Sequence, residues 1–157
     1  MKPKTQLASL LILIVVSITV ISCKKDDNES KQKTKTELLT AGPWKRTSLI
    51  SNPAYDWYAD GTFATDVLSV MKSCESDNLD IYRTNGTGET DEGPTKCDQS
   101  DPQTWPFTWA FTDNETKLVF YGTDEYILTE LTETTLRFHS TFVENGVSYT
   151  HDETYGH

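Results

Sequence analysis

The chain has 157 residues, of which 14 are basic and 24 are acidic, so its formal net charge at neutral pH is −10. Without Lys2 and Lys4, which lie in the N-terminal segment described next, 12 basic residues stand against 24 acidic ones, a charge of −12. Nucleic-acid binding rests on Lys and Arg side chains that neutralise phosphates, so this balance excludes nucleic acid as a partner. The length allows one domain after the N-terminal segments, but not two.

The first residues have the pattern of an export signal. Lys2 and Lys4 precede an apolar run from Leu10 to Ile21. As a helix of about 1.5 Å per residue, this run is too short for the roughly 30 Å hydrocarbon core of a bilayer. A cleaved signal is therefore favoured over a permanent membrane span.

The segment Val20-Ile21-Ser22-Cys23 resembles the lipobox of bacterial lipoproteins. The resemblance implies that residues 1–22 are a lipoprotein signal peptide and that Cys23 becomes the acylated first residue of the mature chain. Each buried methylene contributes about 0.8 kcal/mol, so the two or three acyl chains of a lipoprotein hold it firmly to a membrane. The alternative is an ordinary secretory signal with an incidental cysteine.

The segment from Lys24 to Glu29, KKDDNE, resembles the Lys-then-acidic signal that sends lipoproteins of Bacteroidota to the cell surface. It implies a lipid-anchored position in the outer membrane, exposed at the cell surface. If these charges are only a solvated spacer, a periplasm-facing position is the alternative. Residues 23–36 carry no aromatic or aliphatic side chain beyond Cys23, so we predict a flexible charged tether there and a β domain at 37–157.

Two cysteines are left once Cys23 is assigned to lipidation, Cys74 and Cys97. In an oxidising envelope, an even count of two predicts one disulfide, and no neighbouring His or Cys has the spacing of a zinc site. The chain-entropy model gives a bridge over this loop about 3 kcal/mol of stabilisation.

The rest of the domain has the pattern of antiparallel β structure. Short runs rich in Thr, Tyr, Phe, Val and Ile alternate with turn signals such as Asn85-Gly86 and Asn145-Gly146. About eight strands are predicted, at 44–51, 80–85, 87–92, 107–112, 117–121, 125–131, 135–143 and 147–155. Short helices are expected at 36–39 and 65–72. Regular short strands of this kind indicate a small barrel or a sandwich.

The last hairpin allows a prediction of register. If Asn145-Gly146 is a two-residue type I′ turn, then Phe142 lies opposite Tyr149, and Ser140 lies opposite His151. One face of the hairpin is then aromatic and points inward, while the other is polar and carries Arg137 and His139. His139 and His151 lie on opposite faces, which disfavours a shared metal site.

The inward face also carries three polar side chains, those of Ser140, His151 and Glu153. They are either a set that satisfies its own hydrogen bonds or the polar groups that orient a ligand in an apolar cavity. No strained nucleophile turn or donor loop surrounds Ser140, so we predict no catalytic residues and no enzyme. The residues expected to line a cavity are Phe138, Ser140, Phe142, Tyr149, His151 and Glu153.

The segment DWYADGTFATDV begins like a calcium loop, with Asp56, Asp60 and Gly61 at the spacing of an EF-hand. Tyr58 occupies a ligand position, and Val67 stands where the bidentate Glu is required. A looser calcium site built from Asp56, Asp60 and Asp66 is the weaker hypothesis, and an Asp-Gly turn is favoured.

Three aromatic residues fall in expected loops, Trp57, Tyr58 and Trp105. Such side chains either fold back over a barrel mouth, which we favour, or stack on a glycan or a partner protein.

Three stretches of the chain together resemble the lipocalin-like domain of Bacteroidota lipoproteins: LLTAGPWKRTSLI, CESDNLDIYRTNGTGETDEGPTKCDQSDPQT and YILTELTETTLRF. The resemblance implies a small antiparallel barrel or half-open sandwich, with Trp44 packed at one end under an Arg side chain. Arg46 is the candidate for that partner, since the register places Arg137 outside. It also implies a non-enzymatic domain that binds a small apolar or amphipathic ligand without a cofactor, or a structural module that recognises a glycan or an envelope protein.

Overall fold

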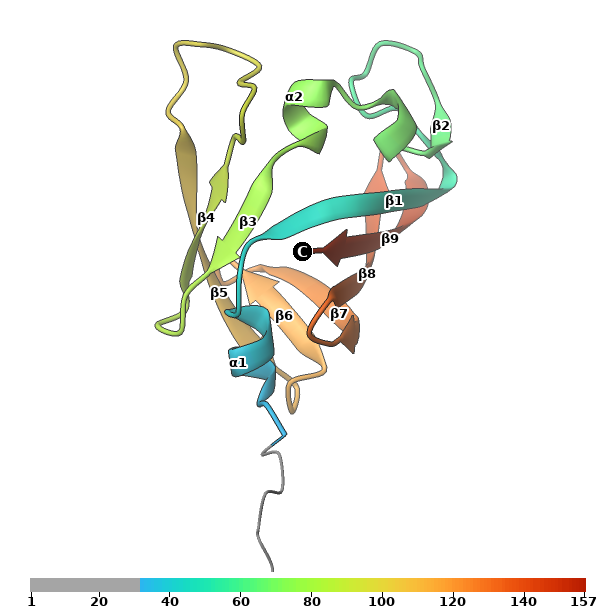
Figure 1. Ribbon diagram of the computed structural model, residues 1–157. Coiled ribbons are helices and arrows are strands. Elements are labelled where there is room, and N and C mark those ends of the chain that lie inside the picture. Colours follow the sequence, from blue (N-terminus) through green and yellow to red (C-terminus); the bar gives the residue numbers. More distant parts are fainter. Residues whose placement is uncertain (1–31) are drawn as a thin grey trace, which may run out of the picture. The chain divides into compact units, whose positions relative to one another are not determined.

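The computed structural model describes residues 32–157 of the chain. The predicted signal peptide, the lipidation site Cys23 and most of the predicted tether lie outside the described residues. The strands of the described part are β1 (Trp44–Tyr55), β2 (Ala64–Asp66), β3 (Leu79–Tyr82), β4 (Thr87–Asp91), β5 (Thr104–Thr112), β6 (Lys117–Phe120), β7 (Asp124–Leu131), β8 (Thr135–Glu144) and β9 (Val147–Gly156) (Figure 1). Its helical elements are α1 (Lys35–Leu39), the 3₁₀ turn η1 (Leu68–Val70) and α2 (Ser73–Ser76).

Eight of the strands form a closed antiparallel barrel. From β3 to β9, each strand pairs with the next one in the chain, and β1 pairs with both β3 and β9. The β1–β9 pairing runs from Lys45 opposite Gly156 to Asn52 opposite Thr150, which closes the sheet on itself. Strand β2 is an extra strand that pairs with β1 alone. The predicted all-β barrel is confirmed, and it is closed rather than a half-open sandwich.

The predicted register of the last hairpin is also confirmed. Phe142 pairs with Tyr149, and Ser140 pairs with His151. The turn residues Asn145 and Gly146 have φ angles of 51° and 78°, the left-handed conformations that a type I′ turn requires. Arg137 is exposed on the outer wall, where it forms an ion pair with Glu130 of β7.

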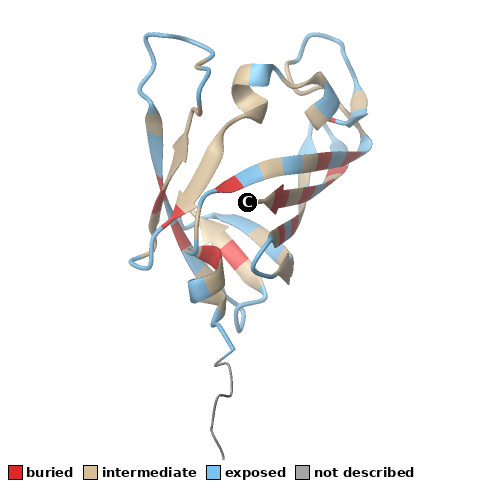
Figure 2. Ribbon diagram, viewed as in Figure 1, coloured by how far each residue is buried: buried red, intermediate tan, exposed pale blue. Residues whose placement is uncertain are grey.

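Buried and exposed residues alternate along the strands, as expected for a barrel with one face in water (Figure 2). The main core cluster consists of Leu39, Trp44, Tyr82, Phe107, Trp109, Leu118, Leu136, Phe138 and Tyr155.

One end of the barrel is closed by α1 and the last residue of the chain. Thr34 and Glu37 form a capping box that begins α1, and Leu39 is fully buried at its end. The indole of Trp44 is also fully buried and donates from Nε1 to the carbonyl oxygen of Leu39 at 2.8 Å. The ring of His157 packs against this indole in a tilted arrangement, with the ring centroids 3.9 Å apart. We call this end the closed end.

The helix expected over residues 65–72 is wrong. Ala64–Asp66 is strand β2, because Asp66 pairs with Ile50 of β1, and the tertiary pairing overrides the local helical pattern. The Asp66 carboxylate then accepts from the backbone N–H of Ser69, which begins the 3₁₀ turn η1 instead of a longer helix. The other expected helix, at 36–39, agrees with α1, although α1 begins at Lys35, inside the span that the sequence assigned to the tether.

Candidate functional site

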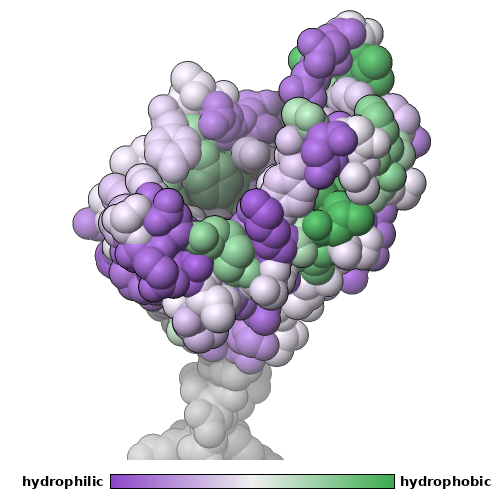
Figure 3. All heavy atoms as spheres, turned by 90° about the horizontal axis from the view of Figure 1, so that it is seen from above, coloured by the Kyte–Doolittle hydropathy of each residue, from purple (hydrophilic) through white to green (hydrophobic). Residues whose placement is uncertain are grey.

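The end of the barrel opposite α1 is open and leads into a cavity of about 600 Å³. From above, the molecule is visibly hollowed at this end, and the depression reaches apolar side chains (Figure 3). We call this end the open end. The cavity is lined by Arg46, Trp57, Tyr58, Met71, Glu75, Asn78, Asp80, Tyr82, Thr90, Phe107, Phe120, Tyr121, Asp124, Tyr126, Phe138, Glu153 and Tyr155.

The floor of the cavity is polar and lies next to the closed end. Arg46 follows Trp44 by two residues on the same face of β1, so its side chain enters the barrel directly beside the buried indole. Its Nε lies 3.0 Å from Glu153 Oε2, and its Nε and Nη2 donate to Tyr155 Oη at 3.1 and 2.9 Å. Tyr155 Oη in turn donates to Glu153 Oε2 at 2.8 Å. Arg46, Tyr155 and Glu153 therefore form one mutually hydrogen-bonded group.

Asp80 is a second carboxylate on this floor. It lies opposite Trp44 in the β1–β3 pairing and opposite Thr90 in the β3–β4 pairing. Thr90 Oγ1 donates to Asp80 Oδ1 at 2.7 Å. Since a short cross-strand hydrogen bond holds one oxygen, the carboxylate is fixed in orientation inside the barrel.

The floor groups perturb one another's protonation. Burial raises the pKa of Asp80, against the opposing effects of the Thr90 hydrogen bond and the Arg46 charge. Burial by itself would lower the pKa of Arg46, but Tyr155, Glu153 and Asp80 outweigh it and raise that pKa above its ordinary value. The pKa values of Tyr82 and Tyr155 are raised well above the ordinary range, chiefly by burial. Arg46 is therefore a permanent cation, and both tyrosines are neutral.

The walls of the cavity are aromatic. Phe120 makes edge contacts with Tyr126 and Phe107, and Phe138 packs against Tyr126 and Tyr155. Gly88 makes room for one of these rings. It lies opposite Phe107 in the β4–β5 pairing, and a Cβ atom at this position would lie 2.2 Å from the Phe107 ring.

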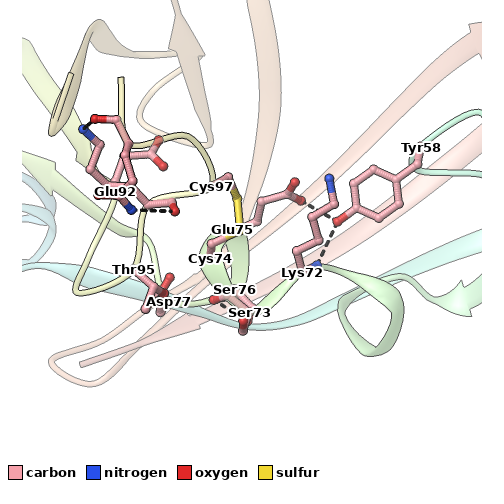
Figure 4. The surroundings of a disulfide bond; sticks show 12 residues. Tyr58, Lys72, Ser73, Cys74, Glu75, Ser76, Asp77, Glu92, Thr95 and Cys97 are labelled. Carbon is pink, nitrogen blue, oxygen red and sulfur yellow. Dashed lines mark hydrogen bonds between the residues drawn. A yellow bond between two sulfur atoms is a disulfide. The ribbon is translucent and has the colours of Figure 1, made fainter. Parts of the chain in front are cut away.

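The rim of the cavity is formed by the segment between β1 and β3 and by the β6–β7 turn. Trp57 and Tyr58 both bond to Glu75 of α2, at 3.3 and 2.8 Å from its Oε2. Tyr58 Oη also accepts from the backbone N–H of Lys72 at 2.8 Å, and the Lys72 ammonium lies 4.8 Å from the Tyr58 ring centroid (Figure 4). Trp57 and Tyr58 thus fold back onto the mouth of the cavity, the arrangement favoured from the sequence.

The predicted disulfide is confirmed. Cys74 of α2 is bonded to Cys97 in the long β4–β5 connection, with Cα atoms 5.1 Å apart and a sequence separation of 23 (Figure 4). The bridge holds α2, and with it Glu75, against a connection that has no regular structure of its own. It therefore supports the rim of the cavity.

The six residues expected to line the cavity are divided between two places. Phe138 and Glu153 line it. The other four, Ser140, Phe142, Tyr149 and His151, are not among its lining residues, so this part of the expectation is wrong. The physical reason is Tyr55 at the end of β1, whose ring packs edge-on against Phe142, Tyr149 and His151 at 5.6, 5.1 and 5.2 Å. Strand β1 extends beyond Ser51 to Tyr55, and the Tyr55 side chain therefore covers the part of the hairpin's inner face that carries Phe142, Tyr149 and His151.

Ser140 and His151 are not joined by a hydrogen bond in the described part of the chain. They are opposite in the β8–β9 register, but His151 Nε2 is buried and has no hydrogen-bond partner among the described residues. Burial lowers the pKa of His151, so its imidazole is neutral at physiological pH.

Two further sequence predictions are resolved by the geometry. The ring that packs against Trp44 belongs to His157, so the expectation of an arginine is wrong; Arg46 belongs to the cavity floor instead. Trp105 lies on the outer wall of β5, 45% exposed, with its indole N–H donating to Glu92 at 3.0 Å. It is therefore separate from Trp57 and Tyr58, which line the cavity.

The three carboxylates considered as calcium ligands accept hydrogen bonds from backbone N–H groups a few residues along the chain. Asp56 accepts from the backbone N–H groups of Asp60 and Gly61, Asp60 from that of Thr62, and Asp66 from that of Ser69. Within residues 32–157, no group of three or more His, Cys, Asp or Glu side chains is arranged to hold a metal ion.

Most of the cavity, including its polar floor, was not predicted from the sequence. The hairpin register identified Phe138 and Glu153, but not Asp80 and Tyr82 of β3 or Tyr126 of β7. Each of these residues has the inward parity of its strand, so the signal was present. Met71 and Glu75 carry no such signal, because they lie outside the barrel strands.

No protein-family model matches the chain, and no curated protein is significantly similar to it. Across the described residues, no helix is both long and apolar enough to span a bilayer.

Proposed function

We propose that this chain is a non-enzymatic lipoprotein of the bacterial outer membrane whose lipocalin-like barrel binds a small apolar or amphipathic ligand. The acyl chains on Cys23 anchor it, residues 23 to about 34 form the spacer, and the barrel faces the cell exterior. The cavity carries the proposal, because a hollow of about 600 Å³ with aromatic walls and a few fixed polar groups is the usual form of a small-molecule site.

Size and shape support a ligand over a packed core. An eight-stranded barrel is just wide enough either to be filled by its own side chains or to hold one small ligand. Here the closed end is filled, with Trp44, Leu39 and Leu118 fully buried, while the open end contains the cavity. A purely structural barrel has no need of a polar group fixed in orientation at the bottom of such a hollow.

The test is binding of a neutral lipophilic fluorescent probe, N-phenyl-1-naphthylamine, with one substitution made at two positions. Phe138→Trp adds ring volume inside the cavity, and we expect at least a tenfold loss of probe affinity. Phe142→Trp makes the same change four residues further along the same face, where Tyr55 separates the ring from the cavity, and we expect little effect. Absence of probe binding to the unmodified protein, or equal affinity in both variants, would contradict the proposal.

The anchoring part of the proposal has its own test. Cys23→Ala is expected to move the protein from the membrane fraction to the soluble fraction, and a protein that stays with the membrane would contradict lipidation. Replacing Lys25, Asp26 and Asp27 with Ala is expected to protect the barrel from protease added to intact cells. Unchanged cleavage would instead support a position that does not depend on this segment.

The alternative function is recognition of a glycan or an envelope protein through the aromatic residues Trp57, Tyr58 and Trp105. It has weaker support, because Trp57 and Tyr58 are bonded to Glu75 at the cavity rim while Trp105 lies on the outer wall. Trp105→Ala is the substitution that tests it, since this side chain is exposed and does not line the cavity.

A further inference from the structure

The ionisable groups of the cavity are strongly unbalanced. One basic side chain, that of Arg46, lines it, against four acidic ones, those of Glu75, Asp80, Asp124 and Glu153. With all carboxyls ionised, the formal balance of the lining is −3. Lys72 lies beside the rim, with its ammonium group 4.8 Å from the centroid of the Tyr58 ring, but it is not a lining residue, and counting it leaves the balance at −2.

The single arginine of the lining already has an acidic partner and a hydrogen-bond partner within the protein. Its guanidinium is bonded to Glu153 Oε2 and to Tyr155 Oη, and it lies 5.3 Å from the centre of the Tyr155 ring. A carboxylate ligand that took Arg46 from Glu153 would leave Glu153, only 8% exposed, without its partner. Removing one member of a buried ion pair leaves an uncompensated charge and is strongly unfavourable, so Arg46 is poorly placed to bind an anion.

The remaining groups are suited to a positive charge. Nine of the lining side chains are aromatic, among them Trp57, Tyr58 and Tyr126. Aromatic faces attract cations through the negative potential above the ring, and they recognise quaternary ammonium groups in particular. Asp80 supplies a carboxyl oxygen at the floor, and Glu75 and Asp124 add two more carboxyl groups to the lining.

We infer that the ligand of this cavity is an amphipathic organic cation, an amine or quaternary ammonium compound with an apolar body, and not a fatty acid or other organic anion. The inference deepens the proposed function and rests on it. The cationic group lies among the aromatic rings within reach of Asp80, Glu75 or Asp124, and the apolar part contacts Phe107, Phe120 and Phe138.

Three ligands with the same ten-carbon chain provide the test: decyltrimethylammonium, decanol and decanoate, each used below its micelle concentration to displace N-phenyl-1-naphthylamine. Charges in a partly buried site interact over several ångströms, so a lining with a net negative charge favours the cation over the anion. We expect decyltrimethylammonium to bind at least tenfold more tightly than decanoate, with decanol between them. The ratio should shrink as salt is added, because the mouth of the cavity is open to solvent.

A matched pair of substitutions locates the charge effect. Asp80→Asn keeps an oxygen acceptor for Thr90 but removes the negative charge, and it should weaken decyltrimethylammonium binding about tenfold while leaving decanol unchanged. Asp152→Asn makes the same change on the outer face of β9, where the carboxylate bonds to His139, and it should change neither affinity. The circular dichroism spectrum and melting temperature of Asp80→Asn establish that it is folded.

The outcomes separate this inference from the proposed function. Decanoate bound as tightly as decyltrimethylammonium, or Asp80→Asn and Asp152→Asn giving the same ratio of cation to decanol affinity, would overturn the cation preference while the cavity remained a binding site. Failure of the neutral probe itself to bind would overturn the proposed function, and the inference with it.

Discussion

Aromatic rings gather at both ends of this barrel, but they do different things there. At the closed end, the Trp44 indole is covered by α1 on one side and by His157 on another, and its N–H bonds to Leu39. At the open end, rings such as Phe120 and Tyr126 are only partly covered and face a cavity with charged groups on its floor and rim. Aromatic side chains alone therefore do not form a packed core. One end of the barrel is closed because α1 and His157, which lie outside the barrel strands, cover the Trp44 indole.

The largest effect should come from breaking the closed end. Trp44→Ala removes the largest fully buried side chain and a buried hydrogen bond, so we expect a loss of about 3–5 kcal/mol in the free energy of unfolding. Urea denaturation followed by circular dichroism measures it. Trp105→Ala is the control, because that indole is exposed on the outer wall, and a loss within about 1 kcal/mol is expected. Equal losses for the two tryptophans would contradict the assignment of Trp44 as the plug.

The second effect concerns the open end. Replacing Cys74 and Cys97 together by Ala releases a loop of 23 residues, and the chain-entropy model predicts a loss of about 3 kcal/mol. Because the bridge holds α2 and Glu75 at the rim, protease cleavage in residues 92–103 should become faster, and probe affinity should fall as well. Stability lost with no change in probe affinity would show that the rim does not depend on the disulfide.

A smaller loss of stability is expected when the N-terminal cap of α1 is removed. Thr34→Ala removes the side-chain acceptor that caps the helix, and the expected cost is about 1 kcal/mol of unfolding free energy. Thr34→Ser keeps the hydroxyl acceptor and should restore most of it. A cost as large for Ser as for Ala would mean that the cap is not the source of the effect.

The smallest effect on stability at neutral pH is expected from His151, which packs against Tyr55 and Phe142. Burial lowers its pKa in the folded protein below the ordinary value of about 6.5, so the fold favours the neutral ring. The sign follows from this: the contribution to stability is complete above about pH 6.5 and is lost as pH falls from there toward the lowered pKa. His151→Leu should lose less stability over that range than the unmodified protein. His139→Gln, on the outer face, is the control and should retain the loss.

Several features could be read from local pattern. The register of the last hairpin was predicted correctly, because Asn-Gly requires a left-handed turn and side chains alternate with a period of two, which fixes both register and face. The disulfide followed from the two cysteines that remain in a chain with a predicted export signal. The closed barrel was one of two expected architectures, since strand pattern does not specify whether the first and last strands pair.

The sequence by itself determined the approximate positions of the eight barrel strands, the register of the last hairpin with its polar and apolar faces, and the Cys74–Cys97 bridge, because each depends on residues close together in the chain or on a count. Only the tertiary structure decided that Arg46 pairs with Glu153 across the β1–β9 closure, that His157 covers Trp44, and that Tyr55 fills half of the hairpin's inner face. These contacts join residues about 95 to 115 apart in sequence, where local periodicity carries no information and the closure of the sheet sets the geometry.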